Sequence, residues 1–168
     1  MSDPETGAFP EALREVCGVE LSFDFEPFDA FLDADDTTTW LRHWTGNEEV
    51  TGDDFRVFGM DGTGGYAAFW LVRPRAEVTE QPVVFLGSEG ETGVVAANMD
   101  ALLWLMAAGR GPYEAAVSGE DTAAPHSGVA EIAARHAPGT GPRDPEAITE
   151  EAQAEFPHFG AVMDALCC

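Results

Sequence analysis

Three acidic residues in the first third of the chain are spaced so that they could bind a cation. Asp33, Asp35 and Asp36 begin as the first ligands of a calcium-binding loop do. The sixth position is Thr38, however, and a calcium loop needs glycine there for its sharp turn. A metal site is therefore not expected, and the three carboxylates are predicted to contact a cationic partner.

A glycine-rich segment, Asp61-Gly62-Thr63-Gly64-Gly65, has the composition of a phosphate-binding loop. It leads into an apolar, strand-like run, so no helix N-terminus would face a bound anion. A tight hairpin turn is the preferred interpretation, because glycine adopts positive φ at little cost. Asp61 is kept as a candidate partner contact.

Two carboxylates two residues apart could serve as the acid and base of a hydrolase. Glu89 and Glu91 lie between two predicted strands, and glycine and serine surround them without apolar shielding. A solvated loop is the preferred interpretation. Both residues are therefore candidate partner contacts, and hydrolysis remains an alternative.

The other common catalytic motifs are absent from the sequence. A Walker-type phosphate loop needs a lysine, and the chain contains none. The segment Gly87-Ser88-Glu89-Gly90 is no nucleophile elbow, because Leu86 stands two positions before the serine. The histidines are isolated from one another, at positions 43, 126, 136 and 158. We expect no catalysis and no cofactor.

The cysteines predict neither a disulfide framework nor a zinc site. There are three of them, Cys17, Cys167 and Cys168, and they lack the spacing of metal ligands. The Cys167-Cys168 pair superficially resembles a prenylation signal. A reduced, frayed tail is the preferred interpretation.

The first fifty residues are predicted to be helical and acidic. Short helices are expected over residues 10–16 and over residues 27–32, where Pro27 would begin the second one. The spacing of Trp40, Leu41 and Trp44 predicts a further helix with one apolar face. These helices would form a lid on a sheet, with both tryptophans in the core.

The middle of the chain, residues 55–116, is predicted to be a β-meander with one buried helix. Short aromatic or β-branched runs separated by turn residues indicate antiparallel strands at 55–58, 66–73, 82–86 and 92–96. Asn98 should cap a helix over residues 99–108 that ends at Gly109. The fold class is therefore α+β.

Residues 117–168 are expected to be a variable helical extension within one domain, 1–168. A modest helix is predicted over residues 129–136. Asp144-Pro145 should begin another, broken at Pro157, and a last turn should end at Leu166.

The charge of the chain restricts its partners. The formal net charge is −23, from 31 acidic residues and 8 arginines, and residues 1–60 hold 15 of the acidic residues. Such a charge repels phosphate backbones and anionic lipids, so neither nucleic-acid nor membrane binding is expected. A basic protein partner would be attracted. The alternative is that the acidity only keeps the protein soluble.

Location and origin are also suggested by composition. The apolar runs are too short to cross a bilayer, and the first residues are acidic, whereas a secretory signal begins basic. We therefore expect a cytoplasmic protein. The Ala/Gly/Asp/Glu bias without lysine suggests a GC-rich bacterial genome.

The order of residues over 55–116 resembles the SUKH superfamily, the Smi/Knr-like domains of bacterial immunity proteins and fungal cell-wall regulators. The matching runs are FGMDGTGGYAAFW (58–70), PVVFLGSEGE (82–91), VVA (94–96) and the helix over 99–108. Many members open with a Trp-containing motif followed by Leu-Pro. This chain has Trp40 and Trp44 but no such Leu-Pro pair.

The resemblance implies an α+β fold without catalysis that binds through a sheet-and-loop surface. In bacteria it implies an immunity protein that neutralises a toxin, often a nuclease. We therefore expect an acidic, non-catalytic domain that binds a basic toxin. A regulatory or ligand-binding module of the same fold is the first alternative, and a hydrolase using Glu89 and Glu91 is the second.

Overall fold

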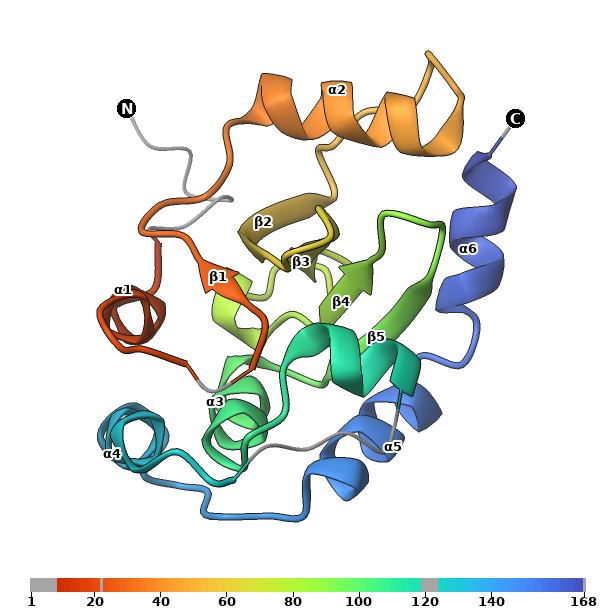
Figure 1. Ribbon diagram of the computed structural model, residues 1–168. Helices are drawn as coiled ribbons and strands as arrows, with labels where there is room; N and C mark the ends of the chain where they lie inside the picture. The colour runs from red at the N-terminus through yellow and green to blue at the C-terminus, as the bar shows by residue number, and fades with distance from the viewer. Residues whose placement is uncertain (1–8, 22, 119–123, 168) are drawn as a thin grey trace.

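The computed structural model describes residues 9–21, 23–118 and 124–167. Within these residues lies a five-stranded antiparallel sheet whose strands follow sequence order. The strands are β1 (Glu26–Pro27), β2 (Phe55–Met60), β3 (Tyr66–Trp70), β4 (Val83–Leu86) and β5 (Thr92–Ala96), as Figure 1 shows. Neighbours in sequence pair throughout, so the sheet is a meander. The predicted α+β fold and the four predicted strands are confirmed.

Both faces of the sheet are buried. In β4, Val83 and Phe85 belong to one apolar core, whereas Val84 and Leu86 belong to the other. This alternation follows from the two-residue period of a strand, which sends successive side chains to opposite faces. It explains why β4 is apolar at every position although its neighbours are antiparallel.

Helices α1 (Glu11–Cys17), α3 (Met99–Ala107) and α4 (Ser127–His136) cover one face. Asn98 Oδ1 accepts the Ala101 amide hydrogen at 2.9 Å and so caps α3. Gly109, at a φ of 97°, follows the end of the helix. The prediction that α3 is the central buried helix is confirmed by its fully buried side chains, Leu102, Leu103, Leu105 and Met106.

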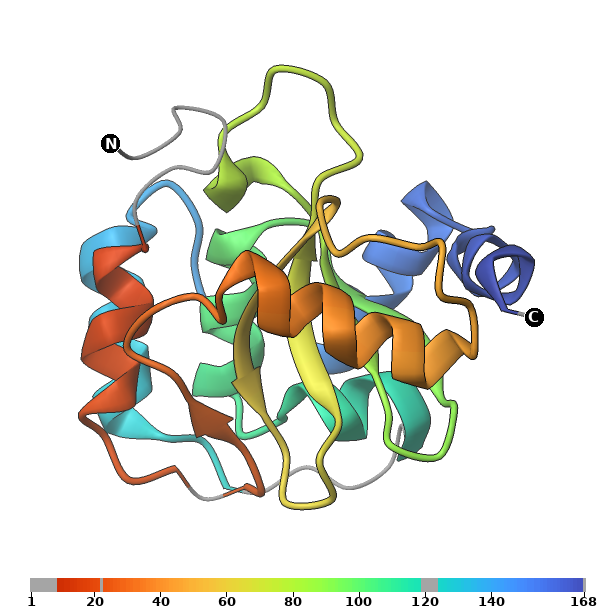
Figure 2. The same ribbon diagram turned by 90° about the horizontal axis from the view of Figure 1, so that it is seen from above.

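Helix α2 (Ala34–Thr45) lies across the opposite face (Figure 2). Its Leu41 side chain is buried there. Helix α6 (Phe159–Leu166) covers the same face through Phe159 and Met163. Helix α5 (Pro145–Glu155) contributes Ile148 to one core and Ala152 to the other. The C-terminal helices are thus part of both cores. Of the three N-terminal helices predicted to form a lid, only α2 covers this face, since α1 covers the other.

The helix predicted over residues 27–32 is wrong. Pro27 pairs with Gly59 in β1, and the chain then continues beside β2. The Phe28 amide donates to Phe58 O at 2.8 Å, and the Leu32 amide donates to Val57 O at 3.0 Å. Proline is tolerated in β1 because this strand is an edge, where its missing N–H leaves no ladder bond unmade.

Candidate functional site

The three acidic residues predicted as partner contacts lie together at the start of α2. Asp33 is the N-cap, and its Oδ1 accepts the Asp36 amide hydrogen at 2.7 Å. Asp35 and Asp36 are exposed in the first helical turn, where negative charge is favourable to the helix dipole. The Asp33 carboxylate repels that of Asp36 and raises the pKa of Asp36. Three exposed carboxylates therefore mark this helix end.

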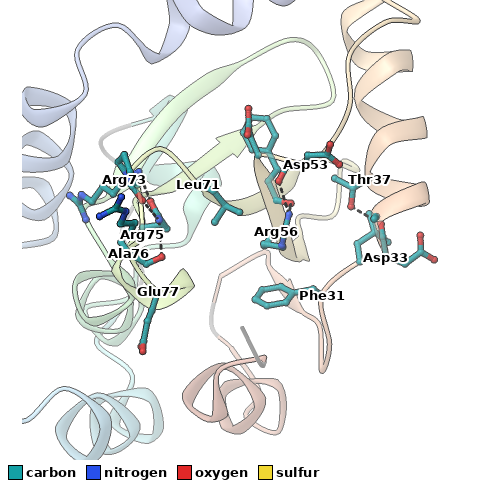
Figure 3. Close-up of a pocket in the computed structure, with 16 residues that line it drawn as sticks. Phe31, Asp33, Thr37, Asp53, Arg56, Leu71, Arg73, Arg75, Ala76 and Glu77 are labelled. Atoms are coloured by element: carbon teal, nitrogen blue, oxygen red, sulfur yellow. Dashed lines mark hydrogen bonds between the residues drawn. The ribbon is translucent and has the colours of Figure 1, made fainter. Parts of the chain in front are cut away.

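A groove of about 1040 Å³ opens beside the start of α2 (Figure 3). Asp33, Thr37 and Asp53 stand on one side of it, and residues 73–77 stand on the other, with Leu71 between them. Phe31 adds a second apolar contact surface. The groove thus combines apolar side chains with charged edges.

The acidic edge of the groove is open to a partner. Asp53 and Asp54 are exposed in the turn before β2. Among the residues that the structure describes, neither of them nor Asp33 takes part in an ion pair. Their charges are therefore available to a cation from outside.

Three arginines line the groove, and among the described residues only Arg73 of these three takes part in an ion pair. Arg73 donates to both carboxylate oxygens of Glu155 at 2.7 Å, which neutralises its charge. Arg56 Nη1 donates to Asp53 O at 2.8 Å and to Phe55 O at 2.9 Å. Arg75 is exposed and has a φ of 65°, a left-handed conformation that is uncommon for a residue other than glycine.

Asp61 is not a surface contact, contrary to its selection as a candidate. Its side chain is buried and the residue is 2 % exposed. Its Oδ1 accepts from the Gly65 amide at 2.8 Å and from the Thr63 hydroxyl at 2.7 Å. The carboxylate thus closes the β2–β3 hairpin turn, and the predicted turn is confirmed. These hydrogen bonds engage the carboxylate oxygen that a partner would need.

Glu89 and Glu91 lie in the turn between β4 and β5, and they differ in environment. Glu91 Oε1 accepts the Glu89 amide hydrogen at 3.0 Å, so this side chain folds back on its own turn. Glu89 is exposed and lines a second pocket beside α2. The structure therefore assigns the two carboxylates different surroundings.

Asp53, Asp54 and Glu77 are groove residues that were not predicted from the sequence. The adjacent acids after Gly52, directly before a predicted strand, are a local signal that could have selected Asp53 and Asp54. Glu77 lies more than twenty positions later in the chain, where it caps a 3₁₀ turn, η1 (Val78–Glu80). Only the fold therefore brings it to the same groove.

No protein-family model, no curated protein and no solved structure matches this chain. Across residues 9–21, 23–118 and 124–167, no helix has the length and apolar character needed to span a membrane. The same residues contain no group of three or more histidine, cysteine or acidic side chains placed to hold a metal ion.

Proposed function

We propose that this chain is a non-catalytic protein-binding domain whose groove binds a basic segment of another protein. The observation that carries the proposal is the acidic edge of the groove, where Asp33, Asp53 and Asp54 lack ion-pair partners among the described residues. Apolar contact at Phe31 and Leu71 would supply the buried centre of an interface, and the carboxylates its polar rim.

The partner we propose is a basic toxin that the domain neutralises in the bacterial cytoplasm. The net charge of −23 favours a cationic surface, and a nuclease presents such a surface to its nucleic-acid substrate. The resemblance of residues 55–116 to the SUKH superfamily supports the same role. Hydrolysis is not proposed, because Glu91 is engaged by its own turn.

A regulatory module of the same fold without a toxin is the competing function. The two differ in one measurable property, which is whether the bound partner loses a toxic activity. Co-expression with the partner should restore growth if the domain is an immunity protein. Binding without any effect on growth would favour the regulatory module.

The groove is tested by capturing the partner from the native host with the full chain at low salt. D53N/D54N should bind the captured protein about 2- to 30-fold more weakly, since each exposed ion pair contributes about 0.2–1 kcal/mol. Association should also slow as salt rises, because screening shortens the range of attraction.

The matched control is E131Q/E150Q, which removes the same number of charges at exposed positions on α4 and α5, outside the groove. This variant should bind nearly as the unmodified chain does. Equal losses in the two variants would show that total charge, and not the groove, determines binding. A captured partner that is not basic would also contradict the proposal.

A further inference from the structure

A second pocket, of about 580 Å³, lies at the other end of α2. Trp40, His43 and Trp44 line it from the helix, Gly64 from the β2–β3 turn, and residues 88–90 from the β4–β5 turn. Three segments distant in sequence thus meet here. The sequence selected Glu89 as a candidate partner contact but assigned no binding role to the two tryptophans that line the pocket with it.

The aromatic side chains of the pocket are held in position. The Trp40 and Trp44 rings stack with centroids 6.2 Å apart and planes 24° apart, as their four-residue spacing on a helix permits. Trp40 also contacts Tyr66 of β3, with ring centroids 4.6 Å apart. The Trp44 indole N–H donates to Gly87 O at 2.7 Å. This bond joins the helix to the base of the β4–β5 turn.

The turn that carries Glu89 is also well defined by hydrogen bonds. The Gly87 amide donates to Glu91 O at 2.7 Å, and the Gly90 amide donates to Gly87 O at 3.1 Å. Gly90 has a φ of 93°, which suits glycine. Glu89 is exposed at the tip of the turn and lines the same pocket as Trp40 and Trp44.

An acidic side chain and tryptophan rings that line the same pocket are a combination that favours a cation. Ring faces attract positive charge through their quadrupole, most strongly for tryptophan, and a carboxylate adds direct attraction. In the described part of the chain the cations over aromatic rings are Arg14 on Phe9 and Arg73 on Phe156. Among the described residues, therefore, no arginine lies over the ring of Trp40 or Trp44.

We propose that this pocket binds the guanidinium group of an arginine side chain presented by the protein partner. Arginine fits better than lysine, because its planar group stacks on an indole while donating hydrogen bonds to a carboxylate. The inference rests on the proposed function, since it specifies one contact of the same basic partner. Helix α2 has 12 residues, or about 18 Å, so one partner face could reach both the groove and the pocket.

The test is a titration of the full ¹⁵N-labelled chain with Nα-acetyl-arginine amide, followed through the indole N–H signals of the four tryptophans. The Trp40 and Trp44 signals should shift and saturate. Trp104, whose indole donates to the Thr140 hydroxyl at 2.8 Å, is the internal reference and should stay in place. The uncharged citrulline analogue should produce no saturable shift.

Two variants distinguish binding in the pocket from general electrostatic attraction to an acidic protein. E89Q should weaken arginine amide binding about 1.4- to 5-fold, the range expected of an exposed ion pair, and E131Q should leave it unchanged. Shifts of all four indoles, equal shifts with citrulline, or equal effects of the two variants would overturn the inference. Tighter binding of tetramethylammonium than of arginine amide would also overturn it.

The inference and the proposed function fail separately. A partner captured through the groove, together with unmoved Trp40 and Trp44 signals, would overturn the pocket assignment and leave the proposed function standing. Saturable indole shifts without a captured basic protein would overturn the proposed function and the role of a partner's arginine.

Discussion

At the scale of single residues, two neighbouring glycines in the β2–β3 turn are needed for different reasons. Both were expected to adopt positive φ, but only Gly64 does, at 94°. Gly65 instead provides space, because a Cβ there would lie 2.6 Å from Phe85 Cζ and 3.1 Å from Leu86 O. The expectation for Gly65 is therefore corrected, since close packing excludes a side chain there.

Replacing Gly64 by alanine should destabilise the fold by about 1 kcal/mol, because a Cβ is unfavourable at positive φ. Nothing lies within 4 Å of a Cβ at this position, so the cost is one of backbone conformation alone. Denaturant midpoints of Gly64→Ala and of Gly139→Ala, which has equal space without positive φ, provide the comparison. Equal midpoints would contradict this account.

At the scale of elements, two histidines that are isolated from one another in the sequence have structural roles on α4. The Glu15 carboxylate on α1 accepts hydrogen bonds from His136 and Arg135 on α4, and these bonds lower the pKa of Glu15. A lowered carboxyl pKa stabilises the fold above the pKa of the unfolded chain, and this contribution is lost as pH falls through the folded pKa. His126 caps α4 by accepting the Val129 amide hydrogen at 3.2 Å.

The buried helix α3 provides the main test of the core. Leu103→Ala should lower the free energy of unfolding by about 2–5 kcal/mol, because Leu103 is fully buried and its truncation leaves a cavity. Val162→Ala on α6 is the control; Val162 is 40 % exposed, and its loss should change stability by no more than about 0.5 kcal/mol. Similar losses in the two variants would show that α3 is not central.

At the scale of the whole molecule, negative charge acts on stability as well as on binding. A net charge of −23 on 168 residues causes self-repulsion in the compact state. The described ion pairs connect separate elements at only a few places, such as Arg73 with Glu155 on α5. Most carboxylates therefore repel one another and are stabilised by solvent.

Raising sodium chloride from about 10 mM to about 300 mM should increase the melting temperature, because the Debye length falls from roughly 30 Å to less than 10 Å. E131Q/E150Q, with two fewer negative charges, should melt higher than the unmodified chain at low salt, and the difference should shrink as salt is added. Calorimetric scans at several salt concentrations measure both effects. A melting temperature independent of salt would show that self-repulsion is not significant.

Much of the fold could be predicted because its signals are local. Short runs of aromatic or β-branched residues, the glycines of the β2–β3 turn and the cap at Asn98 are all local signals, and they determined β2 to β5 and α3. Charge, being a sum over composition, was also determined by the sequence. The conformation of the segment after Pro27 was not determined by such local signals. Its amides donate to β2 and not to residues four positions earlier, as they would in a helix.

Only the tertiary structure decided where the candidate sites lie. The groove needs Asp53 and Glu77 on opposite sides, and the aromatic pocket needs the Trp44 indole on Gly87 O, a contact across 43 positions of sequence. Such contacts depend on how α2 packs over the sheet and on the register of its strands. No local sequence pattern encodes contacts between residues so far apart in the chain. The sequence therefore specified which kinds of side chain are available, and packing determined which of them meet.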